Sequence, residues 1–316
     1  MMKINHTRRA GILILLIAIF TVTGCKKDFT AAAPGDGTTA SLNFYGMSET
    51  FPFYNSINSS YGGVGIFVDK EENASYFINS QLATLPYFEF NGLSKLIMFP
   101  YLAADPLGKT MYLDYKAGEH QVIFSYLVAK EADKTVGMPL LRMADTTIKM
   151  AAGSHSSMYL ADAPAAEGAR AVYKLVRTEQ PLEKAVTVGK VSVRFVNLSP
   201  DAGNLRVSLV DANGTENTSL LPQNLAFAGA SDYTALDISG STDRQLLIRV
   251  YSSTGNIPLI TSAIPAQAGH SFEMVIHGFK AAHQQQVVSG VNADGSPSFK
   301  TVTLPVSLSL TARQTY

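Results

Sequence analysis

Val191-Ser192-Val193-Arg194-Phe195-Val196, followed by Asn197-Leu198-Ser199-Pro200-Asp201-Ala202-Gly203, is the stretch that decides the fold of this 316-residue chain. Its first six residues alternate apolar and polar side chains, the pattern of a β-strand with one buried face. The residues that follow suit a turn. Pro200 presets φ for the first turn position, and Asp201 can hydrogen-bond the backbone just beyond it. Gly203 can adopt a positive φ at little cost. The stretch therefore predicts a strand that ends in a tight turn.

The same alternation recurs in short runs along the chain, bounded by Gly, Pro, Asn and Asp. C-terminal to the opening stretch, such runs cover residues 205–210, 246–251, 272–276 and 302–306. Two segments between runs contain the Asn and Gly residues that turns favour: Asp211-Ala212-Asn213-Gly214 and Ser253-Thr254-Gly255-Asn256. Helical signals are confined to residues 131–134 and 163–171, where Pro164 suits the start of a short helix. The chain is predicted to be all-β.

Strand signals follow one order in both halves of the chain. Phe67-Val68-Asp69 and Leu209-Val210-Asp211 each end a run, and an Ala-x-Gly step precedes a later run at 151–153 and at 266–269. Each half then ends with a further alternating run, at 171–176 and at 299–304. We therefore expect two tandem antiparallel Ig-like β-sandwich domains, over residues 41–180 and 185–316. The polar segment 178–184, broken by a proline, is the expected boundary.

Residues 193–203 resemble the opening of a bacterial envelope repeat that is known only as a domain of unknown function. In that family a strand ends in a Ser-Pro-Asp-Ala turn, matched here by residues 199–202, and leads into an Ig-like sandwich. The family's Ala-x-Ala-Gly step is matched by residues 266–269. The resemblance covers about residues 190–305. Over 41–178 the corresponding opening, at 42–48, lacks Ser-Pro-Asp. The family has no established catalytic residues, so the resemblance implies none here.

The first 25 residues predict secretion and lipidation. A basic start precedes the apolar run 11–20, which is followed by Val22-Thr23-Gly24-Cys25. This order is typical of a signal peptide, and the run is shorter than the roughly 20 residues that a spanning helix needs. The ending resembles the lipobox of bacterial lipoproteins, which implies a signal peptide over 1–24, cleavage between Gly24 and Cys25, and a lipidated Cys25. An uncleaved anchor helix is the alternative. Residues 25–40 predict a flexible tether rich in small residues.

Charge and cysteine content narrow the possible partners. The chain has 25 basic and 25 acidic residues. Three of the basic residues and none of the acidic ones precede Cys25, so the mature chain has 22 against 25, a net charge of −3. This balance argues against a nucleic-acid partner. The single cysteine leaves stability to the apolar core rather than to disulfides. Lys26 is not the aspartate that, by resemblance to known sorting, would suggest retention in the inner membrane, so we expect the outer membrane of a Gram-negative bacterium.

Patterns that carry chemistry are few. The sequence has no His-Glu-x-x-His, no Gly-x-Ser-x-Gly, no calcium loop, and no glycine-rich phosphate loop before a helix. His277 and His283 flank a loop start, but two scattered histidines are weak evidence for a metal site. Ser154 is next to His155, yet neighbours on an extended chain point to opposite faces. The sequence therefore predicts no catalytic residue, no metal and no cofactor.

Aromatic density is the one feature with a functional implication. Residues 44–101 contain fourteen of the thirty aromatic residues. Exposed aromatic rings stack on sugars or anchor protein partners, whereas buried ones only fill a core. Both possibilities are open at this point. The candidate ligand surface consists of Phe51, Phe53, Tyr54, Tyr61, Tyr87 and Phe88.

We therefore expect a non-enzymatic, membrane-anchored lipoprotein of the cell envelope that acts as an interaction or spacer module. Its partners would be the membrane, through a lipid at Cys25, and a protein or glycan. One alternative is a surface glycan-binding lipoprotein that uses the aromatic residues of the first domain. A second alternative is an unrecognised hydrolase.

Overall fold

The computed structural model describes residues 38–50, 63–69, 112–127, 140–180, 189–211, 213–238 and 245–315. Asp36–Tyr316 clusters as one compact unit. The described residues form seventeen strands and no helix, which confirms the all-β prediction. Accordingly, these ranges contain no helix long and apolar enough to cross a membrane.

The first half of the unit contains two sheets. One has the strand order β3-β1-β6-β7, and the other has the order β2-β4-β5. The turn between β5 and β6 contains the predicted Ala-Ala-Gly step, with Gly153 at a φ of 75°. The strands are β1 (Thr39–Gly46), β2 (Gly63–Val68), β3 (Leu113–Lys116), β4 (Gly118–Leu127), β5 (Leu140–Met150), β6 (His155–Asp162) and β7 (Tyr173–Gln180).

The second half repeats this arrangement of two sheets. Their orders are β11-β8-β14-β17 and β10-β9-β12-β13, and Gly269, in the turn before β14, has a φ of 79°. The strands are β8 (Lys190–Asn197), β9 (Leu205–Val210), β10 (Glu216–Asn217), β11 (Thr234–Asp237), β12 (Gln245–Ser252), β13 (Pro258–Pro265), β14 (Ser271–His277) and β17 (Ser309–Gln314). The last strand, β17, occupies the same sheet position in the second half that β7 occupies in the first. The sequence pattern predicted residues 299–304 as this last strand.

Each half differs from a purely antiparallel sandwich in one central pair. β1 pairs in parallel with β6, and β8 pairs in parallel with β14. Between the two strands of the pair, the chain forms the strands of the second sheet and one edge strand of the first, β3 or β11. It then returns in its original direction, as a parallel pair requires. Backbone bonds at the end of each pair match: Met47 N donates to Leu160 O at 2.8 Å, and Leu198 N donates to Ile276 O at 2.7 Å.

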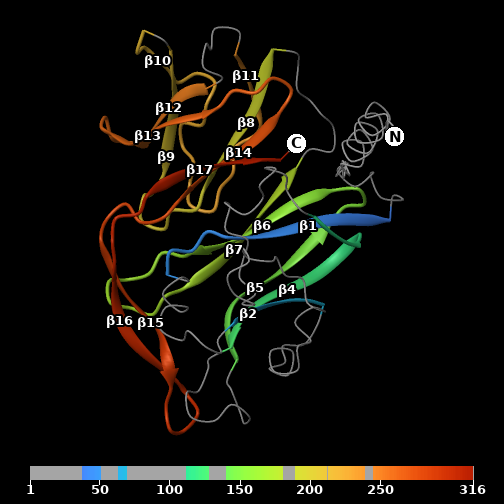
Figure 1. Cartoon of the computed structure of the whole chain (residues 1–316), viewed down its shortest axis with the longest axis vertical. Coiled ribbons are helices and arrows are strands. Elements are labelled where there is room, and N and C mark those ends of the chain that lie inside the picture. The colour runs from blue at the N-terminus through green and yellow to red at the C-terminus, as the bar shows by residue number, and fades with distance from the viewer. Residues whose placement is uncertain are drawn as a thin grey trace, which may run out of the picture. The chain divides into compact units, whose positions relative to one another are not determined.

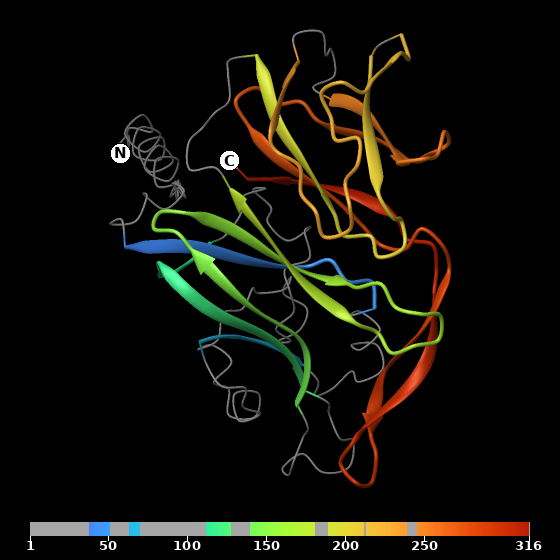
Figure 2. The ribbon, with the colours of Figure 1, turned by 180° about the vertical axis from the view of Figure 1, so that it is seen from behind.

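Four sheets stack through three apolar clusters. One cluster lies between the two sheets of the first half and includes Leu42 and Phe124, and another lies between the two sheets of the second half and includes Phe195 and Ile248. The third joins the halves and contains Tyr45, Met47, Tyr159, Ala161, Val176, Val196, Leu198 and Val275. β6 and β8 are consequently buried along both faces. Figure 1 shows β1, β6 and β7 between β4 and β5 on one side and β14 and β17 on the other, and Figure 2 shows the same order from behind.

A long hairpin from the second half completes the core of the first. β15 (His283–Val291) and β16 (Pro297–Leu304) lie between β14 and β17 in the sequence. Their buried apolar residues belong to the cluster of the first half, with Val287, Val302 and Leu304 among them. The hairpin runs alongside the first half in Figure 1. Although residues 283–304 fall within the predicted second sandwich, they pack against the predicted first one.

The segment 163–171 explains how the hairpin is held. The predicted short helix does not form there, because the backbone of this segment pairs with β15 instead. Gly168 N donates to Gln284 O at 2.8 Å, Gln286 N to Ala169 O at 2.8 Å, and Ala171 N to Gln286 O at 2.9 Å. The hairpin edge is thus covered by a loop of the first half, which satisfies backbone groups that an open edge would expose.

Replacing Leu304 with Ala tests this shared core. Leu304 is fully buried in the cluster of the first half, so the substitution should lower the free energy of unfolding by about 2–5 kcal/mol. The matched control is Val306→Ala, just beyond β16, where the side chain is exposed and the effect should stay within about 0.5 kcal/mol. Urea unfolding followed by circular dichroism measures both. Equal effects would contradict the packing of the hairpin.

Candidate functional site

Most of the predicted site residues lie outside the described residues. This is the case for the cleavage and lipidation residues Gly24 and Cys25, and for the whole candidate aromatic surface, Phe51, Phe53, Tyr54, Tyr61, Tyr87 and Phe88. Three other aromatic residues of the same region are described, and all are buried: Phe44, Tyr45 and Phe67.

The chain bends over Pro200-Asp201-Ala202, within the predicted turn, and Gly203 has a φ of 70°. Asn197 stabilises this bend from the end of β8, because its Nδ2 donates to Gly203 O at 3.0 Å and its Oδ1 accepts from Ser199 N at 3.1 Å. Asp201 does not bond the backbone just beyond it as predicted. Its carboxylate accepts from the amides of Lys280 and Ala281, at 2.7 and 2.9 Å. The turn therefore joins β8 to the start of the hairpin, a distant contact that local turn rules do not show.

The first half has a corresponding junction built from different residues. Asp162, at the end of β6, is buried and accepts from Ser48 Oγ at 2.7 Å, from Glu49 N at 2.6 Å and from Thr50 Oγ1. Burial raises the pKa of Asp162, and the hydrogen bonds from Thr50 and Ser48 oppose that shift. In the second half the hydroxyl of Ser199 donates instead to Gly278 O, at 2.7 Å. In each half, the junction fixes the chain where it leaves the sheet that contains the parallel pair.

A buried carboxylate joins the two halves. Glu273 of β14 is fully buried and lies beside Arg194 of β8 in the parallel register. Arg194 Nε and Nη2 donate to Glu273 Oε1 at 2.8 and 2.5 Å. From the first half, Tyr159 Oη and Gln180 Nε2 donate to Glu273 Oε2 at 2.6 and 2.8 Å. Each carboxylate oxygen is thus bound by a different half of the molecule.

A second arginine extends this network. Arg313 of β17 is buried, and its Nη1 donates to Tyr159 Oη. Its guanidinium carbon lies 3.0 Å from the ring centroid of Tyr45, a cation–π contact. Burial alone would raise the pKa of Glu273, but the charges of Arg194 and Arg313 lower it below its ordinary value. Glu273 is therefore ionised at neutral pH.

Sequence reasoning missed this network because it took Arg194 for the solvent side of an alternating strand. Period-two alternation shows which residues share a face, but it does not show whether water or another sheet covers that face. The available signal was the lone carboxylate Glu273, placed within the otherwise apolar run 272–276. Charged groups are seldom buried unless they are paired, so the partner had to be a cation on a neighbouring strand.

A polar cluster at the edge of the same interface brings a serine and a histidine together. His277 Nε2 lies 3.2 Å from Ser309 Oγ and 2.9 Å from Thr311 Oγ1, and its Nδ1 lies 3.2 Å from Glu49 Oε1. Ser309 is directly opposite His277 in the β14–β17 register, so the strand pairing itself accounts for that contact. Glu49 comes from the first half, and no sequence motif linked these residues.

The other histidines considered in the sequence do not gather. His283 stacks on Phe279, with ring centroids 5.5 Å apart, and its Nδ1 lies 2.8 Å from Glu167 Oε2. The ring of His155 packs edge-on against Tyr112 at 5.1 Å, and burial lowers its pKa. Within the described ranges no three His, Cys, Asp or Glu side chains come close enough to hold a metal ion.

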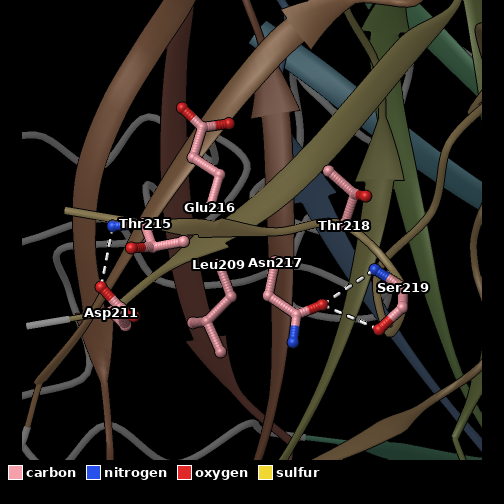
Figure 3. Close-up of a pocket in the computed structure, with 7 residues that line it drawn as sticks. All are labelled: Leu209, Asp211, Thr215, Glu216, Asn217, Thr218 and Ser219. Carbon is pink, nitrogen blue, oxygen red and sulfur yellow. Dashed lines mark hydrogen bonds between the residues drawn. The ribbon is translucent and has the colours of Figure 1, made fainter. Parts of the chain in front are cut away.

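The surface has an open hollow of about 430 Å³ at the β9–β10 corner, shown in Figure 3. Its polar groups are already engaged. Asp211 Oδ1 accepts from the amides of Asn213 and Thr215, and Asn217 Oδ1 accepts from Ser219. Hydrogen bonds from Tyr251, Arg249 and Ser208 lower the pKa of Glu216 to about 2. These contacts form turns and a surface ion pair, and they leave no convergent set of groups for a ligand.

Comparison with known proteins identifies no family. No family model matches the chain, and no curated protein matches it. The solved structures that match include one described as "The Bacillus anthracis TIE protein", with 10% identity, a TM-score of 0.22, and coverage of 88% of this chain and 48% of that one. The chain therefore spans about half the length of that protein. The fold assignment here rests on the sheets themselves.

Replacing Glu273 with Gln tests the buried network. The variant keeps the shape of the side chain but leaves two buried guanidinium groups without their carboxylate, which should cost about 3–5 kcal/mol of unfolding free energy. The matched control is Glu216→Gln, which breaks the partly exposed pair with Arg249 and should cost about 1 kcal/mol or less. Calorimetry should show one transition for the wild-type unit. Equal losses in the two variants would show that the network does not join the halves.

Proposed function

We propose that this protein is a non-enzymatic lipoprotein of the cell envelope whose two sandwiches act together as one interaction or spacer module. The observation that carries the proposal is the interface between the halves. Glu273 receives hydrogen bonds from both of them, and an apolar cluster surrounds the contact between their central sheets. Two domains joined in this way hold a fixed distance and orientation, which a spacer needs and which a flexible pair of domains lacks.

The leader supports the membrane part of the proposal. The lipobox-like ending at Gly24 and Cys25 would place a lipid on Cys25. The first strand begins at Thr39, inside the predicted tether 25–40, so residues 26–38 would connect the bilayer to the first strand. A lipoprotein carries more than one acyl chain, which is the condition for stable attachment. We place the protein at the outer membrane of a Gram-negative bacterium, with a protein or glycan as its further partner. The resemblance of residues 193–203 to the envelope repeat is consistent with this placement.

Growth with an alkynyl fatty acid tests the anchor. Wild-type protein should incorporate the label, and its mature N-terminus should be a modified Cys25. Cys25→Ser should remain unlabelled, because it lacks the thiol that accepts the lipid. Thr30→Ser, a small change in the tether, is the control and should label like the wild type. An unlabelled wild-type protein, or a free thiol at Cys25 by mass spectrometry, would contradict the anchor.

The hydrolase alternative has one specific observation in its favour, the contacts among Glu49, His277 and Ser309. A hydrolytic serine would need His277 as its base and Glu49 to orient the imidazole. A fluorophosphonate probe tests this directly. We expect no labelling, because Ser309 is a cross-strand neighbour of His277 and Thr311 Oγ1 lies closer to the same nitrogen. Labelling that is lost in Ser309→Ala but kept in Ser307→Ala would refute the non-enzymatic part of the proposal.

The glycan-binding alternative depends on the six aromatic residues of the candidate surface, all of them outside the described residues. The described aromatic residues of that region pack in the core. We therefore prefer the spacer function to glycan binding.

A further inference from the structure

The buried network between the halves has one positive charge too many. Arg194 and Arg313 are 6% and 4% exposed, and arginine does not lose its proton in proteins. Glu273 is the one carboxylate that pairs with either of them among the described residues. Two cations and one anion leave a net charge of +1 in a region closed to water. An unpaired buried charge is strongly unfavourable, so this charge needs a counter-ion.

The excess charge lies on the side of Arg313. Arg194 uses Nε and Nη2 on Glu273, and its Nη1 donates to Glu179 O at 2.5 Å. Arg313 reaches the same carboxylate only at 3.7 Å, and its Nη1 is engaged by Tyr159. The Nη2 of Arg313 is buried and has no hydrogen-bond partner among the described residues. A charged donor is therefore left without an acceptor.

A second unused donor belongs to the same region. The hydroxyl of Tyr112 is buried, and no described residue forms a hydrogen bond with it. The ring of Tyr112 packs against His155 at 5.1 Å, and His155 is the cross-strand partner of Gln180, whose side chain donates to Glu273. Tyr112 therefore lies beside the network. Burial raises the pKa of Tyr112 above its ordinary value, and the phenol therefore keeps its proton and acts as a donor. Two buried donors, one of them charged, suit an acceptor that carries negative charge.

We propose that a single monovalent inorganic anion of about the size of chloride binds between Arg313 Nη2 and the hydroxyl of Tyr112. Such an ion brings the charge of the network to zero and accepts a hydrogen bond from each donor. It takes part in the interface between the halves, so binding would stabilise their association. The competing occupant is a water molecule, which could accept from Arg313 Nη2 and donate to the unpartnered Asn43 Oδ1. A water would leave the charge unbalanced.

Crystals of the full chain grown in sodium bromide distinguish the two occupants, because bromide scatters anomalously and water does not. We expect an anomalous peak within hydrogen-bond distance of Arg313 Nη2 and the hydroxyl of Tyr112. Density at that position without anomalous signal would identify water and overturn the proposal. An empty position would overturn it equally.

Thermal unfolding tests the site in solution. A ligand bound by the folded state alone stabilises in proportion to the logarithm of its concentration. Replacing sodium gluconate with 0.3 M sodium chloride at equal ionic strength should raise the wild-type Tm, relative to Arg313→Met, by roughly 2–6 °C. Arg249→Met, which removes an arginine from the surface pair, should behave like the wild type. A wild-type response equal to that of Arg313→Met would overturn the proposal. If Arg313→Met does not fold, the bromide crystals decide.

Discussion

The carboxylate of Glu273 is the constraint on which the arrangement of the two halves depends. It accepts hydrogen bonds from Arg194 in its own half and from Tyr159 and Gln180 in the other. A buried charge tolerates little displacement of its partners, because each lost bond leaves a desolvated group. Apolar contacts alone would allow the two central sheets to slide. The ionic network sets one register between them, in the way that a buried polar group specifies pairing in other folds.

The architecture within each half follows from one topological choice. The first strand and the strand after the Ala-Gly turn, at 152–153 or 268–269, lie side by side in parallel, at the centre of the inner sheet. Both of these strands are covered on either face, by their own sandwich and by the opposite half. At their ends Asp162 and Ser199 fix the departing chain. The same plan is thus realised twice with different side chains. The carboxylate that accepts backbone amides is Asp162, at the end of the second strand of the pair, in one half, and Asp201, just after the first strand, in the other.

The hairpin β15–β16 makes the halves interdependent in a second way. It leaves the second half after β14, fills the core of the first, and returns as β17. Arg313, on that returning strand, then reaches the ionic network. Because the hairpin fills part of the core of the first half, unfolding of the second half would remove that part of the core. This property suits the proposed role as a spacer of fixed geometry, attached to the envelope by a lipid.

The sequence by itself determined the fold class, the positions of most strands and the glycine-containing turns, because alternation and turn chemistry are local properties. It also predicted a lipoprotein leader that ends at Cys25, and it contained no recognisable catalytic motif. Only the tertiary structure decided that the inner strands pair in parallel, that residues 283–304 complete the core of the first half, and that Asp201 binds distant amides. It also brought Arg194, Glu273 and Arg313 together. These contacts join residues far apart in the chain, and a pattern of period two cannot show what lies against a strand's second face.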